Sequence, residues 1–423
     1  MPQVIRYTKG SIIYFPEDRD ERVFILQNGI VILTTIDVET AQPATKQIKD
    51  GEFFGVKSAI GHFPREETAT ALTDSTVIAL TIAEFEDLFN NNKQIIMKML
   101  RVFSNQLRQL HKKTESILND VTESQQSGMY AVAKSFYDDG QYVSCCDVCL
   151  RFLKLYPQHP RKDEITKMYT TAHLRIGKTR QTMHNDTAAD EAESSATLQL
   201  FLLPAFERFS KLYEPGNVII CEYETGDSFY LIQSGRVQLI KSVNGVRKNL
   251  DILKAGEFFG EMAILDNSPR TATCVAIGHV KCLEFNKANF ELLMTGEPSM
   301  ALILLRLFCK RIYEQNRRVR ILVIKDLQAR IADVFLMLDE MNPVMNPNER
   351  QRRFNVTITD LARWAGLPLD VTRDEVNKFV ERRKIEVYDT YILVINIADM
   401  KRIVDTRQGV RTDGAGSRWN AVT

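Results

Sequence analysis

The pentapeptide Gly-Glu-Phe-Phe-Gly occurs twice, at residues 51–55 and 256–260, and the sequence around each copy repeats as well. Tyr-Thr-Lys-Gly-Ser-Ile-Ile at 7–13 matches Tyr-Glu-Pro-Gly-Asn-Val-Ile at 213–219. Short β-branched and aromatic runs separated by Gly, Asn and Asp are typical of an antiparallel β-roll. A helical pattern follows each set of runs. The repeat therefore predicts a multidomain α+β chain that contains one jelly-roll-like domain twice.

The second copy carries residues that suit a sugar phosphate. Gly260 has no Cβ, so a ligand can approach the backbone closely, and the free N–H groups of the helical run after it attract an anion. Arg270 offers a planar fork that matches a phosphate diester, and Pro269 fixes the turn before it. Glu261 can accept hydrogen bonds from a sugar hydroxyl, and Thr271 adds a hydroxyl donor. The alternative is a glycine-rich β-turn with a surface Arg–Glu pair.

This segment resembles the phosphate-binding cassette of cyclic nucleotide-binding domains, in which Phe-Gly-Glu-x-Ala is followed by Pro-Arg-x-Ala. The resemblance implies that Glu261 binds the ribose 2′-hydroxyl and that Arg270 binds the cyclic phosphate. We therefore expect a domain at residues 198–296 that takes a cyclic nucleotide, cAMP or cGMP, as a regulatory ligand without a metal. The expected ligand-binding residues of this domain are Phe259, Gly260, Glu261, Met262, Ala263, Arg270, Thr271 and Ala272.

The first copy, residues 1–120, has lost most of this chemistry. Val56 stands where the second copy has a glutamate, so no acceptor for a sugar hydroxyl remains. Arg65 follows a proline at the matching distance, but Glu66 and Glu67 come next, and two acids repel a phosphate. We expect a degenerate cyclic nucleotide-binding-like domain with a structural or dimerising role.

Between the copies, residues 127–178 show apolar residues at helical spacing on both sides of a turn, which predicts a helical hairpin. The pattern resembles a single tetratricopeptide-type repeat, which cannot bury its own face and should lean on a neighbour. Cys145, Cys146 and Cys149 cluster here, and packing as small hydrophobes explains them better than a metal site does. The polar, acidic stretch at 179–197 is the expected linker.

A long dimerisation helix is predicted over residues 297–340. Apolar residues at spacings of four and three, with one polar member, form a coiled-coil seam that predicts a homodimer: Phe308, Ile312, Gln315, Val319 and Leu322. The sequence after this seam resembles the hinge-and-helix junction of the catabolite activator protein. That resemblance places Gln315 and Asn316 where the family reads the purine base across the dimer. Because the family's cyclic AMP readers there are hydroxyl residues, two amides keep cyclic GMP as an alternative ligand.

Residues 350–400 follow the order helix, turn, helix, hairpin, with Thr359 as the expected N-cap of the first helix and Gly366 at its end. This order resembles the winged helix-turn-helix of Crp/Fnr regulators, whose second helix lies in the major groove. The residues offered to double-stranded DNA are Arg373, Lys378, Arg382 and Arg383. Three acids in the same helix repel phosphates, so the alternative is a winged helix that contacts proteins. Residues 401–423 are expected to form a flexible tail.

Composition limits the remaining functions. The formal net charge is +1, so any basic surface must be local. No apolar run reaches the roughly 18 residues that span a bilayer, and no secretory start is present, so we expect a cytoplasmic protein without membrane contact. The sequence contains no nucleophile–base set, metal constellation or P-loop, so we expect no enzyme.

Together these features predict a cyclic nucleotide-responsive DNA-binding transcription regulator of Crp/Fnr type, with its ligand in the second β-roll. The alternative is a cyclic nucleotide sensor or scaffold whose winged helix and helical hairpin bind proteins. Tandem cyclic nucleotide-binding domains also occur in kinase regulatory subunits, but no segment of this sequence looks like their inhibitor segment.

Overall fold

The computed structural model describes residues 2–37, 42–117, 124–179, 204–243, 246–266, 268–341 and 349–407. The chain forms two compact units: Met1–Thr81 together with Tyr313–Thr423, and Ile82–Ile312. These units divide the chain differently from the predicted domains, the first of which kept residues 1–120 together as one roll with the helices that follow it. The helices after the first roll belong to the unit of the second roll, and the last turns of the long helix belong to the unit of the first.

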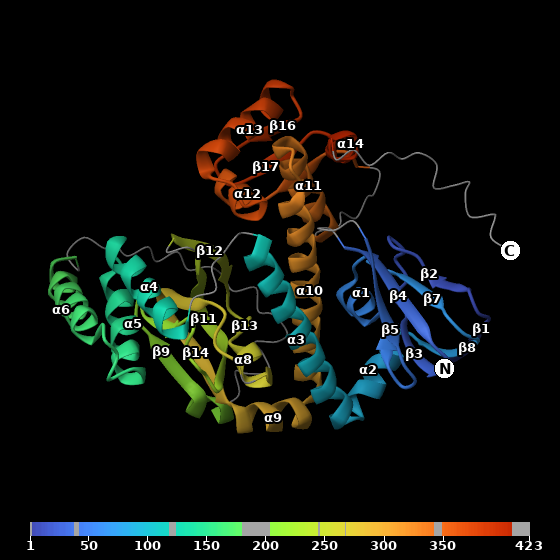
Figure 1. The fold of residues 1–423 in the computed structure, drawn as a ribbon, viewed down its shortest axis with the longest axis horizontal. Coiled ribbons are helices and arrows are strands. Elements are labelled where there is room, and N and C mark those ends of the chain that lie inside the picture. The colour runs from blue at the N-terminus through green and yellow to red at the C-terminus, as the bar shows by residue number, and fades with distance from the viewer. Residues whose placement is uncertain are drawn as a thin grey trace. The chain divides into compact units, whose positions relative to one another are not determined.

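The first roll consists of two four-stranded antiparallel sheets and the short helix α1 (Val56–Gly61) (Figure 1). The sheets have the strand orders β1-β8-β3-β6 and β2-β7-β4-β5. The strands are β1 (Gln3–Tyr7), β2 (Ile12–Tyr14), β3 (Val23–Asn28), β4 (Val31–Ile36), β5 (Pro43–Ile48), β6 (Phe53–Phe54), β7 (Thr68–Ala71) and β8 (Ser75–Leu80). Tyr14, Phe24 and Phe54 stack at the centre of the core, with ring centroids between 5.2 and 6.2 Å apart.

The second roll repeats this architecture. Its strands are β9 (Ser210–Tyr213), β10 (Val218–Ile220), β11 (Ser228–Val243), β12 (Val246–Leu253), β13 (Phe258–Phe259) and β14 (Thr273–Asn286), with helix α8 (Glu261–Asp266) after β13. Four strands run in the order β10-β14-β11-β12, while β13 pairs with β11 and β9 with β14. Tyr230 lies opposite Phe259, as Phe24 lies opposite Phe54 in the first roll. The prediction of one domain present twice is confirmed.

Between the rolls, the described residues form helices. These are α2 (Ile82–Asn90), α3 (Lys93–Ile117), α4 (Gln125–Asp138), α5 (Tyr142–Leu155), α6 (Lys162–Thr179) and the 3-10 helix η1 (Pro204–Phe209). Where the sequence predicted a two-helix hairpin, three helices pack in succession. Cys145 and Cys149 share one hydrophobic core with Val218 and Val275 of the second roll, so these helices do lean on a neighbour. The predicted linker after Thr179 lies outside the described residues.

The long helix predicted over residues 297–340 is divided in two, because α10 (Pro298–Val323) ends and α11 (Leu327–Met341) begins four residues later. The Asp326 side chain accepts a hydrogen bond from the backbone N–H of Ala329 at 2.8 Å and so starts the new helix. Helix α9 (Lys287–Gly296) precedes both. The apolar residues of the predicted seam are already buried within the single chain: Phe308, Ile312, Val319 and Leu322. They are therefore not free to pair with a partner helix, and the homodimer stays a prediction that needs another surface.

The C-terminal module contains a three-stranded sheet in the order β15-β17-β16 and three helices. Its elements are β15 (Arg352–Phe354), α12 (Ile358–Ala365), α13 (Leu369–Glu381), β16 (Ile385–Val387), β17 (Ile392–Val394) and α14 (Ile397–Arg407). The N-cap of α12 is Thr357 and not Thr359, because Thr357 and Asp360 form a reciprocal capping box. Gly366 ends α12 with a φ of 63°, as predicted. The predicted tail is helical up to Arg407, and residues 408–423 lie outside the described part of the chain.

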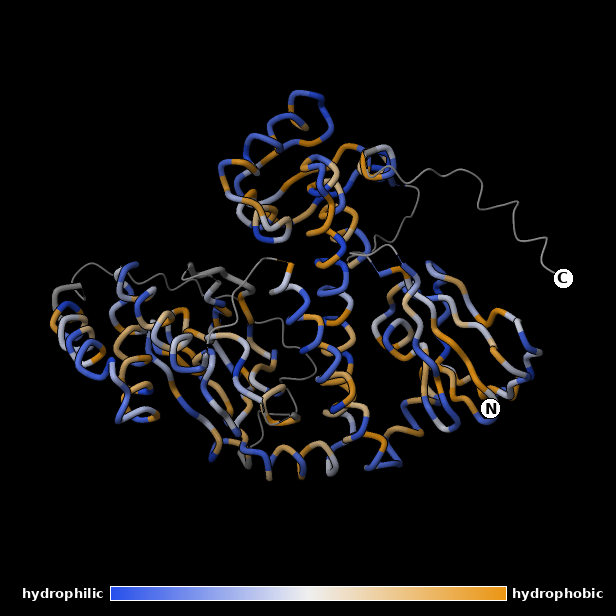
Figure 2. The backbone as a smooth tube through the Cα atoms, in the orientation of Figure 1, coloured by the Kyte–Doolittle hydropathy of each residue, from blue (hydrophilic) through white to orange (hydrophobic). Residues whose placement is uncertain are grey.

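Hydrophobic residues concentrate in the strands of both rolls and along α10 (Figure 2). Within the described ranges, no single helix has the length and apolarity needed to cross a membrane. Only α9 and α10 taken together pass that test, and they are bent by 107° where they meet.

Candidate functional site

Arg270 is the centre of the site in the second roll. Its side chain is buried although it belongs to the loop between α8 and β14. Nη1 donates to the carbonyl oxygen of Gly260 at 2.6 Å, and Nη2 donates to that of Ser228 at 2.6 Å. Nε is buried and has no hydrogen-bond partner among the described residues. The guanidinium is thus fixed in place by two carbonyl groups, and these bonds use two of its five N–H donors.

Glycine is required at two positions around this guanidinium. A Cβ at Gly226 would lie 2.2 Å from the Arg270 Nε, and a Cβ at Gly260 would lie 2.9 Å from Nη1. Gly260 also has a φ of +84°, a conformation that favours glycine. The sequence analysis identified Gly260, but the part that Gly226 plays depends on a tertiary contact that spacing alone does not reveal.

Glu261, the first residue of α8, is almost completely buried at 1% exposure. It forms an ion pair with Nη1 of Arg311 on α10, and Nη2 of Arg311 donates to the Phe258 carbonyl oxygen at 2.9 Å. The sequence analysis did not assign Arg311 to the site. In the sequence, Arg311 stands out only as one of several basic residues beside the predicted coiled-coil seam. The Glu261 carboxylate, which is expected to accept from a sugar hydroxyl, is therefore present and is already paired with Arg311.

One buried thiol belongs to the same roll. Burial raises the pKa of the Cys274 thiol to about 12, and the charges of Arg270, Glu261 and Arg311 also act on it. Phe259 stacks on Tyr230 with centroids 5.0 Å apart, and Met262 and Ala263 are buried beside it in α8.

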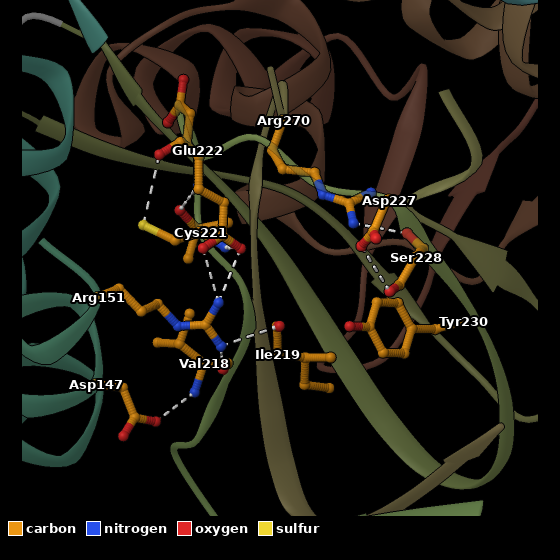
Figure 3. A network of polar contacts seen from close by, with 12 residues as sticks. Asp147, Arg151, Val218, Ile219, Cys221, Glu222, Asp227, Ser228, Tyr230 and Arg270 are labelled. Carbon is orange, nitrogen blue, oxygen red and sulfur yellow. Dashed lines mark hydrogen bonds and ion pairs between the residues drawn. The ribbon is translucent and has the colours of Figure 1, made fainter. Parts of the chain in front are cut away.

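A polar network supports the loop that carries Arg270 (Figure 3). The backbone N–H of Arg270 donates to the Glu224 carbonyl oxygen at 2.9 Å, and its carbonyl accepts from Tyr223 at 3.0 Å. The Glu224 carboxylate accepts two hydrogen bonds from Arg151 of α5, both at 2.8 Å. Arg151 also donates to the Val218 carbonyl oxygen at 2.6 Å. Arg151 thereby connects helix α5 to the loop that carries Arg270.

Thr271 and Ala272, the last two expected ligand-binding residues, are partly buried directly after Arg270. Lys241 donates to the Thr271 carbonyl oxygen at 3.2 Å and pairs with the buried carboxylate of Glu222 at 3.1 Å. The Glu222 N–H in turn donates to Thr273 at 3.0 Å. The backbone that follows Arg270 is therefore held in place as well.

Helix α3 forms a neighbouring wall of this site. It packs against α8 and α9, and Nη1 of Arg108 donates to the Pro269 carbonyl oxygen at 3.3 Å. The predicted purine readers, Gln315 and Asn316, belong to the compact unit of the first roll, and their part in ligand binding stays a prediction. Within that unit, Asn316 donates to the Glu66 carboxylate at 3.0 Å.

Arg65 in the first roll repeats the contacts of Arg270. Nη1 donates to the Gly55 carbonyl oxygen at 2.5 Å and Nη2 donates to that of Arg22 at 2.6 Å. Here, however, the guanidinium lies over the Tyr14 ring, with Cζ 4.5 Å from the centroid. The same framework therefore holds an arginine in both rolls, but its surroundings differ.

Acidic side chains fill the surroundings of Arg65. The buried carboxylate of Glu67 accepts from the Tyr14 hydroxyl at 3.2 Å, and burial followed by the Glu67 charge raises the pKa of Tyr14. Glu66 accepts from Lys57 at 3.2 Å. Glu66 and Glu67 follow Arg65 in sequence as Thr271 and Ala272 follow Arg270, and the loss of phosphate binding in the first roll stays a prediction.

The four residues predicted for DNA binding are all exposed on α13 or just after it. Lys378 pairs with Glu375 at 2.6 Å, and Glu375 is buried and also accepts from Gln328 at 2.8 Å. One of the three predicted acids is thereby turned inward. Asp370 and Asp374 remain exposed near Arg373.

Two segments of the chain, residues 4–92 and 210–296, match the cyclic nucleotide-binding domain family. The chain therefore contains two cyclic nucleotide-binding domains in tandem. Within the described residues, no three His, Cys, Asp or Glu side chains are grouped so that they could hold a metal ion.

Curated relatives fall into two groups. A cAMP-dependent protein kinase regulatory subunit of Mucor circinelloides f. lusitanicus is 39% identical over 85 residues, and the alignment covers 20% of this chain and 20% of the relative. The chain thus spans a fifth of that relative's length. A CRP-like cAMP-activated global transcriptional regulator of Mycobacterium tuberculosis is 24% identical over 189 residues, which are 44% of this chain and 83% of the relative. The solved catabolite activator protein of Thermus thermophilus is 23% identical, with a TM-score of 0.29 over 50% of this chain and 99% of that one.

Proposed function

We propose that the chain is a cyclic nucleotide-responsive transcription regulator that binds cAMP or cGMP in its second roll and DNA through its C-terminal module. The observation that carries the ligand site is Arg270, which is buried, held by two carbonyl groups and left with a donor at Nε. A buried guanidinium with a spare donor favours a phosphate, because charge-assisted hydrogen bonds are strongest away from water.

The second roll is the better site of the two. Both arginines sit on the same carbonyl framework, but Arg65 is followed by two carboxylates and Arg270 by a threonine and an alanine. A cyclic phosphate carries a negative charge, so it is repelled at the first roll and attracted at the second.

Ligand binding at this site acts on α10 through Glu261. The Glu261 carboxylate is paired with Arg311 of α10. A ribose hydroxyl that donates to the same carboxylate competes with this pair and changes how α10 is held. Because α10 leads toward the C-terminal module, the ligand can shift the population between two arrangements of that module, provided that it binds one more tightly.

Helices α12 and α13 with the small sheet suit a winged helix-turn-helix, in which α13 would enter the major groove. Its exposed cations, Arg373, Lys378, Arg382 and Arg383, would contact bases and phosphates. The second candidate function is a nucleotide sensor that binds a protein through the same module or through α4–α6. The exposed Asp370 and Asp374 on α13 favour this candidate, since they repel a DNA backbone.

Calorimetric titration of the full chain with cAMP and cGMP tests the ligand site. Arg270→Ala should reduce affinity by at least about a hundredfold, because it removes a buried charge-assisted pair worth several kcal/mol. Arg65→Ala is the matched control in the first roll and should leave affinity within about threefold. Equal affinity of Arg270→Ala and the parent chain would rule out the ligand site. Selection from random duplex DNA in the presence of the bound nucleotide then distinguishes the DNA regulator from the protein-binding sensor.

A further inference from the structure

The turn that pairs with the backbone of Arg270 contains a tyrosine in a strained conformation. Tyr223 has a φ of 70°, in the left-handed region that bulky side chains rarely adopt. Its N–H donates to the Arg270 carbonyl oxygen at 3.0 Å, and the Arg270 N–H donates to the Glu224 carbonyl oxygen at 2.9 Å. The place of the Arg270 backbone therefore depends on the conformation of this turn.

The first roll contains the same turn with a different side chain. Glu17 also has a φ of 70°, its N–H donates to the Arg65 carbonyl oxygen at 2.9 Å, and the Arg65 N–H donates to that of Asp18 at 2.8 Å. The Glu17 side chain is exposed, whereas the Tyr223 side chain is half-buried. The backbone framework thus does not require a tyrosine, and the ring is explained by what covers it.

Helix α4 covers the ring at its single glycine. Gly128 is buried, and a Cβ there would lie 2.4, 2.5 and 2.6 Å from three carbon atoms of the Tyr223 ring. The ring also packs against the hydrophobic core that α4 shares with the second roll, which includes Met129, Val132 and Val218. Because glycine destabilises a helix relative to alanine, the close approach of the ring accounts for a glycine at this position.

The residues on either side of Tyr223 are held by partners within the second roll. The buried Glu222 carboxylate accepts from the Ser242 N–H at 2.9 Å. The Glu224 carboxylate accepts from the Cys221 N–H at 2.8 Å. The Tyr223 ring therefore has little freedom to move away from α4 unless the turn moves with it, and the turn carries the backbone partners of Arg270.

We propose that Tyr223 is a positioning residue of the nucleotide site, and that α4 holds it through Gly128 and so sets the place of Arg270. A displacement of α4 from the ring loosens the turn and weakens nucleotide binding. The effect on affinity rests on the proposed binding of a cyclic nucleotide at Arg270, whereas the effect on the turn does not. The first roll, where Glu17 is exposed, has no such control.

Hydrogen exchange at the Arg270 amide, measured on the full chain without nucleotide, tests the effect on the turn. Gly128→Ala should speed this exchange by at least about tenfold, because the new Cβ strikes the ring. In a Tyr223→Gly background the ring is absent and the positive φ is relaxed, so Gly128→Ala should have no further effect. Gln126→Ala, at an exposed position of the same helix, is the matched control and should leave the exchange unchanged.

Calorimetric titration with cAMP and cGMP tests the effect on the nucleotide site. Gly128→Ala should bind at least about tenfold more weakly than the parent chain, and in the Tyr223→Gly background it should cause no further loss. A parent chain that binds neither nucleotide contradicts the proposed function, and the exchange at Arg270 then decides on the contact alone. The inference is overturned if Gly128→Ala lowers Tm without changing exchange or affinity, or if it acts equally with and without the Tyr223 ring.

Discussion

At the scale of single residues, the second roll depends on the space around one guanidinium. Gly226→Ala would place a methyl group 2.2 Å from the Arg270 Nε, so the arginine must leave its carbonyl partners. We expect cyclic nucleotide affinity to fall by at least about tenfold, measured by calorimetry. Gly296→Ala is the control, because a Cβ there has no atom within 4 Å. Equal losses of cyclic nucleotide affinity in the two variants would show that the loss does not arise from the space around Arg270.

The Glu261–Arg311 pair gives a second prediction at this scale. Arg311→Met leaves a carboxylate of 1% exposure without its cation, which should lower the free energy of unfolding by about 3 kcal/mol. Adding Glu261→Gln should restore most of the loss, because the uncompensated charge disappears. Chemical denaturation of both single variants and the double variant measures the coupling. Simple additivity of the two losses would contradict the pairing.

At the scale of elements, helix α5 should affect nucleotide binding through the loop that carries Arg270. Arg151→Met removes two hydrogen bonds to Glu224 and one each to the carbonyl oxygens of Val218 and Ile219. The partly buried Glu224 carboxylate then retains the backbone N–H of Cys221 as a donor. We expect lower stability, by about 2 kcal/mol, and a weaker nucleotide affinity, because the Glu224 carbonyl oxygen holds the backbone of Arg270.

The control for this element is Lys134→Met, which removes an exposed pair with Asp138 on α4. An exposed pair of this kind contributes little to stability, so stability and affinity should hardly change. An Arg151→Met chain with normal nucleotide affinity would show that α5 supports the fold without positioning the site.

The same elements show what the sequence reveals and what it does not. The two rolls could be predicted because β-roll strands and the glycine-bounded Phe-Phe pairs depend on local spacing. The cap of α12 was misplaced by two residues because Thr357 and Thr359 are both good caps, and only the reciprocal bond to Asp360 decides between them. Arg311, Arg108 and Arg151 could not be assigned, because helical periodicity shows which face is apolar but not which roll that face meets.

At the scale of the whole molecule, the chain carries two rolls but a single C-terminal module among its described residues. Each chain can therefore present one α13 to DNA. A selected DNA sequence with one recognition half-site would indicate that one copy binds, and a palindrome would indicate two copies related by symmetry. The second result would also require a dimer interface other than the buried face of α10.

The residues of α13 give the last prediction. Arg373 is exposed, so Arg373→Ala should reduce discrimination between the selected site and scrambled DNA by about 1–3 kcal/mol if it contacts a base edge. If Lys378 leaves its pair with Glu375 and contacts only phosphate, Lys378→Ala should weaken binding to every duplex by a similar factor and reduce the salt dependence. Asp374→Asn should strengthen binding to any duplex, because it removes an exposed negative charge near the phosphates. Titrations of labelled duplexes at several salt concentrations measure all three. If no sequence is enriched and Asp374→Asn has no effect at low salt, α13 does not meet DNA, and the exposed acids are better explained by a protein partner.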